Sequence, residues 1–242
     1  MERHTVVKTL ALIGSGMIGG ALARLAVAAG LDVVLTNSRG PETLAGLVAE
    51  LGGRARAATP EEAALAGDLV VATIPLKNYR LLPARALAGR TVIDTMNYYP
   101  DRDGRFDALE TREVTSTELV QRQLADAHVV KAFNNIDFRR LLTSARPAGS
   151  ADRSALPLAG DDPSARAEVA RLLDLLGYDA VDMGAARDSW RSQPGTPVYV
   201  QPYMVPRPEG LGQEEGRRWF FETPGAPLPV RRVEELLAAA AR

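Results

Sequence analysis

Length, composition and charge narrow the possibilities for this chain of 242 residues. Its formal net charge of −1 gives no reason to expect a nucleic acid or a membrane surface as partner, and 46% hydrophobic residues can form a large core. Because the chain has no cysteine, disulfides, thiolate zinc sites and a cysteine nucleophile are excluded. No His, Asp and Glu residues have metal-ligand spacing and no secretory pattern is present, so we expect a cytoplasmic protein without a metal site.

The first predicted elements are a strand at residues 9–13 and an Ala-rich helix that begins near residue 17, joined by the pattern G-x-G-x-x-G. In such a turn Gly14 permits the sharp bend, Gly16 lets a pyrophosphate approach the backbone, and Gly19 lets the helix lie close to the strand. The helix N-terminus then offers free N–H groups to the phosphates. This strand–turn–helix context predicts a dinucleotide-binding site.

Strands and helices continue to alternate through the first half of the chain. Further strands are predicted at residues 32–36, 54–57, 68–73 and 91–94. Helices are predicted at residues 41–51, after the capping box that begins at Thr59, and at residues 79–87. Parallel strands joined by crossover helices predict a doubly wound sheet that binds its ligand at the carboxyl ends of the strands.

The second half keeps this alternation, with more irregular connections. Its predicted elements are a helix from the capping box at Thr115 to about residue 126, a strand at 128–133, a polar surface loop at 139–154, a strand at 155–160, a helix at 163–176, a strand at 178–182 and a helix at 233–241. Because proline cannot donate to a sheet ladder, Pro157 places its strand at a sheet edge.

The turn after the second strand indicates which dinucleotide is bound. A NAD site usually carries Asp or Glu about 20 residues after the glycines, where it holds the ribose 2′-hydroxyl. Here the turn reads Asn37-Ser38-Arg39, with no carboxylate before Glu42. Arg39 can pair with a 2′-phosphate and Ser38 can donate a hydrogen bond to it. We therefore favour NADP over NAD, although Arg39 could also be a solvated residue of an ordinary turn.

The ends of the next strands supply candidates for the rest of the site. Thr73-Ile74-Pro75-Leu76 is expected beside the nicotinamide ribose, with ordinary core packing as the alternative for the two aliphatic side chains. The Asn97 amide could reach a ribose or the carboxamide. Candidates for the substrate side follow two strands, and they are Tyr98, Tyr99, Asn134 and Asn135. Half-buried tyrosines and turn-stabilising asparagines are the alternatives.

Residues for acid–base catalysis are few. The two histidines, His4 and His128, stand at or before the starts of strands, which places them far from the glycine turn. No nucleophile elbow and no phosphate-binding lysine motif is present. We assign no catalytic residue, and a direct hydride transfer between two stacked cofactors would need none.

Five segments of the chain look like those of the NADP oxidoreductases that use the deazaflavin coenzyme F420. The segments match in order and spacing, and they are residues 13–20, 37–39, 72–75, 93–97 and 129–135. The likeness covers about residues 8–187, and it extends to the N-terminal domains of pyrroline-5-carboxylate reductases and to the reductase domains of some membrane metalloreductases. The resemblance implies that Ser15, Met17 and Ile18 accompany the glycines at the pyrophosphate, with Ser38 and Arg39 at the 2′-phosphate.

The resemblance also implies the activity, namely hydride transfer between NADP(H) and coenzyme F420 held face to face. Two alternatives stay open: an NADPH-dependent reductase of a small carbonyl, imine or quinone, and a non-catalytic NADP-sensing module. An open, aromatic-lined cleft opposite the nicotinamide face would favour an enzyme, and a blocked cleft would favour the sensor.

The predicted fold class is α/β, with a Rossmann-like doubly wound, mostly parallel sheet and an irregular C-terminal extension. We assign residues 1–187 to an NADP-binding Rossmann-like domain and residues 188–242 to a Pro- and aromatic-rich cap or dimerisation arm. This extension departs from the compact helical element with which typical members of the family end. Its aromatic residues favour docking over disorder, and we expect a homodimer.

Overall fold

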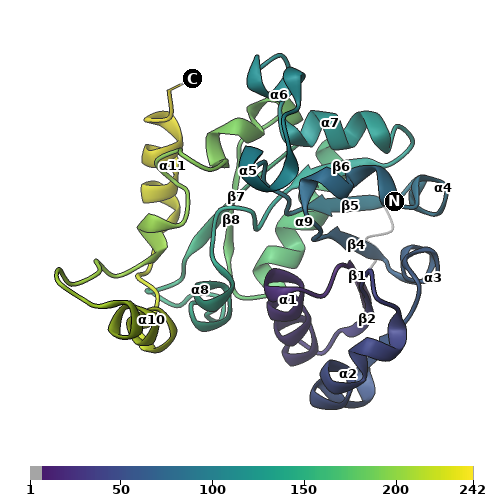
Figure 1. Cartoon of the computed structure of the whole chain (residues 1–242), viewed down its shortest axis with the longest axis horizontal. Coiled ribbons are helices and arrows are strands. Elements are labelled where there is room, and N and C mark those ends of the chain that lie inside the picture. Colours follow the sequence, from purple (N-terminus) through teal and green to yellow (C-terminus); the bar gives the residue numbers. More distant parts are fainter. Residues whose placement is uncertain (1–6, 242) are drawn as a thin grey trace.

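A central β-sheet with helices on both faces forms the molecule, as Figure 1 shows for the computed structural model, which describes residues 7–241. The eight strands lie in the order β3-β2-β1-β4-β5-β6-β7-β8. Neighbouring strands are parallel, except that β6 and β7 are antiparallel. The strands are β1 Thr9–Ile13, β2 Asp32–Thr36, β3 Ala55–Ala57, β4 Leu69–Ala72, β5 Thr91–Asp94, β6 His128–Lys131, β7 Ala155–Gly160 and β8 Asp179–Asp182. The predicted Rossmann-like α/β fold is confirmed.

The helices are α1 Met17–Ala28, α2 Ala45–Leu51, α3 Pro60–Ala66, α4 Ala84–Leu87, α5 Pro100–Asp103, α6 Asp107–Glu110, α7 Ser116–Gln123, α8 Phe138–Thr143, α9 Pro163–Leu175, α10 Gln213–Glu222 and α11 Val230–Ala238. Short 3₁₀ turns add to them at Pro41–Leu44, Gly52–Arg54, Leu76–Leu81, Ala186–Ser192 and Gln201–Tyr203. Of the helices within residues 7–241, none combines the length and the apolar character that crossing a membrane requires.

Alternate residues of the strands form two separate cores, one on each face of the sheet. Leu10 and Leu12 of β1 pack in a cluster with α1 and α9. Ala11 and Ile13 point the other way, into a cluster that includes α3 and α7. Strands covered on both faces are mostly apolar, which explains the apolar runs of residues 10–13 in β1 and 69–72 in β4. The layers leave the carboxyl ends of these strands as the place for a site.

Side-chain caps fix the starts of several helices. Thr59 and Thr115 each accept a hydrogen bond from the backbone N–H three residues later, and Glu62 and Glu118 bond back to the cap residues. Asp162 caps α9 in a similar way. Such local bonds satisfy amides that have no partner within the helix, and both predicted capping boxes are confirmed.

One predicted helix and the predicted sheet position of one strand are wrong. The helix expected at residues 79–87 is interrupted, since a 3₁₀ turn at Leu76–Leu81 is separated from α4 by Leu82 and Pro83. Proline has no N–H to continue a helix and pushes the residue before it into an extended conformation. The strand containing Pro157 is not at the sheet edge, because β7 has β6 and β8 as neighbours. Its pairing with β6 covers only Ala159 and Gly160, so Pro157 is outside that short ladder.

The polar surface loop predicted at residues 139–154 is also incorrect. This segment contains most of α8, which packs against α1, and it buries Arg140 and Leu141 completely. The Asp137 carboxylate caps α8 by accepting from the amides of Arg139 and Arg140. The Arg140 guanidinium donates to the carbonyl of Phe220 at 2.8 Å, so a contact 80 residues away buries this charge.

The segment after residue 187 packs on the far end of the sheet. In Figure 1, α11 (yellow) lies beside β7 and β8, and α10 lies near α8. Val198, Tyr203 and Val233 are fully buried in the same cluster as the strands. The Tyr203 hydroxyl donates to the carbonyl of Ala155 at 2.9 Å. The segment is thus part of the main core.

Candidate functional site

The three glycines of the turn after β1 differ in how closely other atoms approach them. Gly14 has φ +108°, and a Cβ there would lie 2.4 Å from the carbonyl oxygen of Thr73. A Cβ on Gly19 would lie 2.2 Å from the Gly14 oxygen, so helix α1 approaches the strand too closely for any side chain. A Cβ on Gly16 would meet nothing within 4 Å. The first and third glycines serve the fold, and the second leaves open space at the start of α1.

The turn after β2 lies next to the glycine turn, since the Ser15 hydroxyl donates to the carbonyl of Thr36 at 2.8 Å. Asn37 shapes this turn: its side chain accepts from the Arg39 amide at 2.9 Å and donates to the Thr43 hydroxyl at 2.7 Å. Ser38 and Arg39 are exposed. Within residues 7–241 no side chain pairs with the Arg39 guanidinium, so it is available to an anionic ligand.

A cleft of about 440 Å³ opens beside Gly16, at the carboxyl ends of the central strands. Its apolar lining includes Ile18, Ile74, Pro75, Phe133 and Phe138. Its polar lining includes Asn97, Tyr99, Arg102, Asn134 and Tyr199. The cleft therefore extends from the open space at Gly16 into a mainly apolar chamber. Like most small-molecule sites, this chamber has a few polar groups in an otherwise apolar lining.

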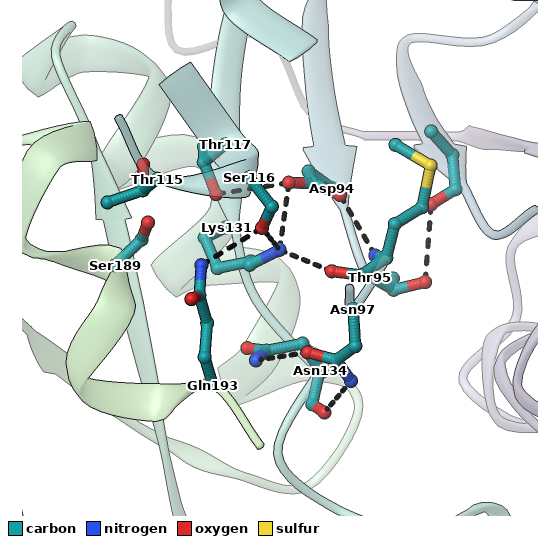
Figure 2. Close-up of polar contacts among 12 residues, drawn as sticks. Asp94, Thr95, Asn97, Thr115, Ser116, Thr117, Lys131, Asn134, Ser189 and Gln193 are labelled. Carbon is teal, nitrogen blue, oxygen red and sulfur yellow. Dashed lines mark hydrogen bonds and ion pairs between the residues drawn. The ribbon is translucent and has the colours of Figure 1, made fainter. Parts of the chain in front are cut away.

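Two asparagines tie the strand ends together, as Figure 2 shows. The Asn97 amide donates to the carbonyl of Asn134 at 2.8 Å, and the Asn134 amide donates to the Asn97 side-chain oxygen at 3.1 Å. Asn134 also donates to the carbonyl of Ser192 at 2.8 Å, which joins the loops after β5 and β6 to the C-terminal segment. The two side chains hold the cleft's polar part in one arrangement.

A buried ion pair lies next to this network. Asp94 and Lys131 are opposite each other in β5 and β6, and both side chains are fully buried. The Lys131 ammonium is 2.9 Å from the Asp94 carboxylate, and it also donates to the Ser116 hydroxyl and to the carbonyl of Met96 (Figure 2). Thr117 donates to the same carboxylate at 3.1 Å. With three acceptors for the ammonium, the charge is well satisfied, and Met96 is held directly before Asn97.

The polar part of the cleft also contains a pair of tyrosines. The hydroxyls of Tyr99 and Tyr199 form a hydrogen bond, although the residues are 100 positions apart. The Asn97 amide lies 3.5 Å from the Tyr199 hydroxyl, and the Arg102 guanidinium lies 4.8 Å from the centroid of the Tyr99 ring. Burial, together with the hydrogen bond to Tyr99, raises the pKa of Tyr199 well above its ordinary value. Tyr199 therefore keeps its proton at physiological pH.

Neighbouring groups fix this pair in place. Burial by itself would raise the pKa of Asp103, but hydrogen bonds from Arg102 and from the Tyr99 amide outweigh burial and bring the pKa below its ordinary value. The carboxylate therefore stays charged and holds the arginine. Val200, directly after Tyr199, has φ 55° and ψ −58°, the centre of a tight γ-turn closed by the Gln201 amide on the Tyr199 carbonyl, and this conformation is strained for a β-branched residue. Its amide donates to the carbonyl of Asn135 at 2.8 Å. Such strain persists only where surrounding contacts determine the conformation.

Most of the predicted site residues are brought together. Gly16, Met17, Ile18, Thr73, Ile74, Pro75, Asn97, Tyr99 and Asn134 line the cleft. Gly14, Ser15 and Gly19 form the turn behind it, and Asn37, Ser38 and Arg39 lie in the adjoining turn after β2. How each of these residues meets a ligand remains a prediction.

Three predicted site residues lie elsewhere. Leu76 is fully buried in the core with α3 and α7, because the chain turns inward after Pro75. Tyr98 donates to the Glu110 carboxylate at 2.6 Å and lines a different hollow. The Asn135 side chain is buried and donates to the carbonyl of Val198 and to the Tyr203 hydroxyl. These three residues lie outside the lining of the cleft, contrary to their expected place beside the ligand, and a role for them in binding is untested.

His128 gains no role in the site. His128 begins β6, at the amino end of the strand, and its ring nitrogen is 3.2 Å from the Asp162 carboxylate. His4 lies outside the described residues. Among residues 7–241, no three His, Cys, Asp or Glu side chains are grouped as metal ligands would be.

Several cleft residues were missed in the sequence. Tyr199 and Phe138 follow no periodic pattern, and their place depends on how the C-terminal segment and α8 fold back. Lys131 stands at the end of a predicted strand, where a lysine in a buried position could have indicated a paired charge.

The chain is similar to known proteins over most of its length. A family described as "NADP oxidoreductase coenzyme F420-dependent" matches residues 9–98. The structure of the hypothetical protein SMa0349 from Sinorhizobium meliloti is 31% identical, with a TM-score of 0.69 over 79% of this chain and 93% of that one. A structure from Arthrobacter sp. FB24, named "putative f420 dependent nadp-reductase", is 26% identical, with a TM-score of 0.63 over 75% and 86% of the two chains.

A curated relative matches only in part. Protein YjhV of Escherichia coli strain K12 is 41% identical over 64 residues, which are 26% of this chain and 43% of that protein. The chain therefore matches less than half the length of this relative. The family match covers the glycine turn and the first strands, so residues 9–98 are similar to the coenzyme F420-dependent family of NADP oxidoreductases, and over most of its length the chain has the same Rossmann-type fold as SMa0349.

Proposed function

We propose that the protein transfers a hydride between NADP(H) and coenzyme F420, held face to face in the cleft. The observation that carries this proposal is the continuity of the open phosphate approach at Gly16 with a mainly apolar cleft of about 440 Å³. When bound, the nicotinamide and deazaflavin rings supply the redox chemistry themselves. The protein then has to bind, orient and exclude water, and it needs no metal for the transfer.

The residues present fit NADP along its length, from the 2′-phosphate through the pyrophosphate to the nicotinamide ring. The open space over Gly16 and the amides at the start of α1 suit a pyrophosphate, which prefers a helix N-terminus. The unpaired guanidinium of Arg39 and the exposed hydroxyl of Ser38 suit a 2′-phosphate. Ile18, Ile74 and Pro75 offer an apolar surface for the nicotinamide ring, and Asn97 offers its amide beside them.

The same cleft has space and surface for a second planar ring. Phe138 adds an aromatic side chain to its lining, and Tyr99 and Asn134 place polar groups within reach. Such a mixture suits a deazaflavin, a planar ring system with nitrogen and carbonyl groups at one edge. These features support F420 as the partner cofactor, in agreement with the family.

A second candidate is the NADPH-dependent reduction of a small carbonyl, imine or quinone. The tyrosine pair Tyr99–Tyr199 favours it, because such an acceptor takes up a proton as well as a hydride and the pair supplies O–H groups in the cleft.

The organisation of the chain is part of the proposal. We infer that residues 188–242 act as a cap over the cleft, since Tyr199 and Val200 line it, and that two copies form a homodimer in the cytoplasm. Light scattering of the full chain is expected to give twice its mass of 26.0 kDa. A mass of one chain would contradict the dimer without affecting the proposed reaction.

The experiment that tests the function is a screen of NADPH oxidation against F420, flavins, quinones, small carbonyls and cyclic imines. We expect the fastest oxidation with F420, slow or no oxidation with flavins, and little activity when NADH replaces NADPH. The Gly16→Val variant is the blank, because its side chain would occupy the phosphate approach. Turnover with a carbonyl or imine alone would favour the second candidate, and no turnover with any acceptor would contradict both.

A further inference from the structure

We propose that Tyr99 and Tyr199 form a proton relay, in which Tyr199 gives the acceptor the proton that accompanies the hydride and Tyr99 replaces it from solvent. This inference rests on the proposed function, because it requires hydride transfer in the cleft. It adds a catalytic residue from the C-terminal segment to a site otherwise built from the strand ends. The relay serves any acceptor that gains negative charge on nitrogen or oxygen when its carbon receives the hydride.

The first step of the argument is the number of protons. Two neutral hydroxyls carry two protons, and the hydrogen bond between Tyr99 and Tyr199 uses one of them. The other proton is therefore free to be donated to a third group. Both residues line the cleft, so an acceptor seated there lies on the side that the free proton can reach.

The second step is the direction of the relay. The Asn97 amide donates to the Tyr199 oxygen at 3.5 Å, so the proton of Tyr199 is directed away from Asn97, toward Tyr99 or the acceptor. Tyr99 is 36% exposed and therefore in contact with water. Either hydroxyl can donate the hydrogen bond that joins the pair, and when Tyr99 is its donor, water, Tyr99, Tyr199 and the acceptor form a chain in which each group donates to the next.

The third step is the electrostatics of the pair. A tyrosine that has given up its proton carries a negative charge until it is reprotonated. The Arg102 guanidinium, 4.8 Å from the centroid of the Tyr99 ring, stabilises that charge, and Asp103 holds the arginine in place. Burial raises the pKa of Tyr199, so this residue gives up its proton only to an atom that has become strongly basic on receiving the electron pair of the hydride.

The reaction balances as follows for NADPH oxidation. The C–H bond of the reduced nicotinamide breaks, and its electron pair and hydrogen form a C–H bond on the acceptor. The π electrons of the acceptor move onto its nitrogen or oxygen. Tyr199 gives its proton to that atom, Tyr99 gives its proton to Tyr199, and a water molecule restores the proton of Tyr99. NADPH is oxidised by two electrons, and the acceptor is reduced by two electrons and gains one proton.

The backbone next to Tyr199 is strained, which suggests that the position of the Tyr199 side chain matters for function. Val200 has the strained backbone of a γ-turn, and its amide donates to the carbonyl of Asn135. Strain of this kind gathers at functional sites, where an accurate side-chain position is worth its cost in stability. A cap that only covered the cleft would need no such constraint next to its tyrosine.

The test compares the full-length wild type with Tyr199→Phe and Tyr99→Phe, and it uses Tyr98→Phe as the matched control. Tyr98 directly precedes Tyr99, but its hydroxyl donates to Glu110 outside the cleft. Each protein is assayed for NADPH affinity by fluorescence titration, and for kcat and KM with F420 and with the cyclic imine 1-pyrroline. Phenylalanine keeps the ring packing and removes only the hydroxyl.

We expect Tyr199→Phe to lower kcat by about 10²- to 10⁴-fold with the acceptor that the wild type uses, the usual contribution of a general acid. NADPH affinity and KM should stay close to those of the wild type, as should all values for Tyr98→Phe. Tyr99→Phe should cause a smaller fall in kcat, because Tyr199 still holds one proton. A purely structural role would instead raise KM and lower the unfolding temperature.

A second readout does not depend on turnover. In protein labelled with ¹³C at the tyrosine Cζ, the hydroxyl-bearing carbon, Tyr99→Phe should shift the signal of Tyr199, and Tyr98→Phe should not. Unchanged kcat in Tyr199→Phe, or an unchanged Tyr199 signal in Tyr99→Phe, would overturn the relay. If the wild type bound no NADPH or oxidised none, the proposed function itself would fail, so the two failures are distinguishable.

Discussion

Arg39 is a guanidinium at the place where a NAD site usually carries a carboxylate. It is exposed, and no side chain within residues 7–241 neutralises it, while Asn37 fixes the backbone of its turn through the Arg39 amide. The turn is therefore held by one residue and charged by another. A substitution of the Arg39 side chain would therefore remove the charge and keep the hydrogen bond by which Asn37 shapes the turn.

Arg39→Ala should weaken NADPH binding by about 1.5–3 kcal/mol, the range for hydrogen bonds to charged groups, and leave NADH binding nearly unchanged. The reason is that only NADPH carries the 2′-phosphate. Fluorescence titration of both cofactors measures the difference. Arg85→Ala, an exposed arginine of α4, serves as the control and should alter neither affinity. Equal losses for NADPH and NADH would show that Arg39 does not distinguish them.

At the scale of elements, the contact of helix α1 with strand β1 depends on Gly19. Gly19→Ala would place a Cβ 2.2 Å from the Gly14 carbonyl oxygen, so the helix would have to move away from the turn. We expect a loss of about 1–3 kcal/mol in the free energy of unfolding, as for other overpacked sites. Urea denaturation measures this loss.

Gly46→Ala in helix α2 is the matched control, since its Cβ would meet nothing within 4 Å. It should stabilise the protein by about 0.5–1 kcal/mol, because alanine has the higher helix propensity. If Gly19→Ala were as stable as Gly46→Ala, the close approach of α1 would not be a requirement of the fold.

The carboxyl ends of β5 and β6 depend on the buried pair of Asp94 and Lys131. Lys131→Met would leave the carboxylate buried without its counter-charge, which typically costs about 3–5 kcal/mol. The double variant Lys131→Met/Asp94→Asn should recover part of that loss, because no net charge stays buried. Chemical denaturation of the three proteins tests this, and a double variant less stable than Lys131→Met would contradict the pairing.

Local signals explain which elements could be predicted. The strand and glycine turn of residues 9–19 and the capping boxes at Thr59 and Thr115 each depend on residues only a few positions apart. Helix α8 was missed, because its Arg140 is buried by Phe220 and Trp219, 80 and 79 positions later. A polar segment of this kind looks exposed until its distant partners are known.

The candidate site divides in the same way. The phosphate-binding end was predictable, since it lies within a turn whose glycine spacing has a mechanical meaning. The opposite end depends on Tyr199, which reaches Tyr99 only after the chain has crossed the whole sheet. Tyr98 and Tyr99 are equivalent in sequence, and only the folded loop shows that Tyr99 lines the cleft and Tyr98 does not.

At the scale of the whole molecule, the C-terminal segment contributes both to the core and to the cleft. Val198, Tyr203 and Val233 are fully buried with the strands, and Tyr199 lines the cleft. The boundary proposed at residue 187 thus separates two parts of one hydrophobic core. The segment is expected to fold with the sheet in a single transition.

Removal of all residues after Arg187 should therefore abolish turnover and lower the unfolding temperature, because each buried aliphatic or aromatic side chain contributes about 1.5–3 kcal/mol. Differential scanning calorimetry and the NADPH oxidation assay measure the two effects. The Tyr199→Phe variant, with its segment intact, separates lost chemistry from lost stability. A truncated protein that stayed as stable and as active as the full chain would show that the segment is dispensable.

The most direct test of the central claim follows the hydride itself. The enzyme is mixed with F420 and with NADPH that carries deuterium at the transferred position of the nicotinamide ring, and the product is analysed by mass spectrometry. We predict that F420 reduced in unlabelled water carries the deuterium, because the two rings meet directly in the cleft and the label is not exchanged with the solvent. Reduced F420 without the label, or NADPH that remains unoxidised in the presence of F420, would contradict the account.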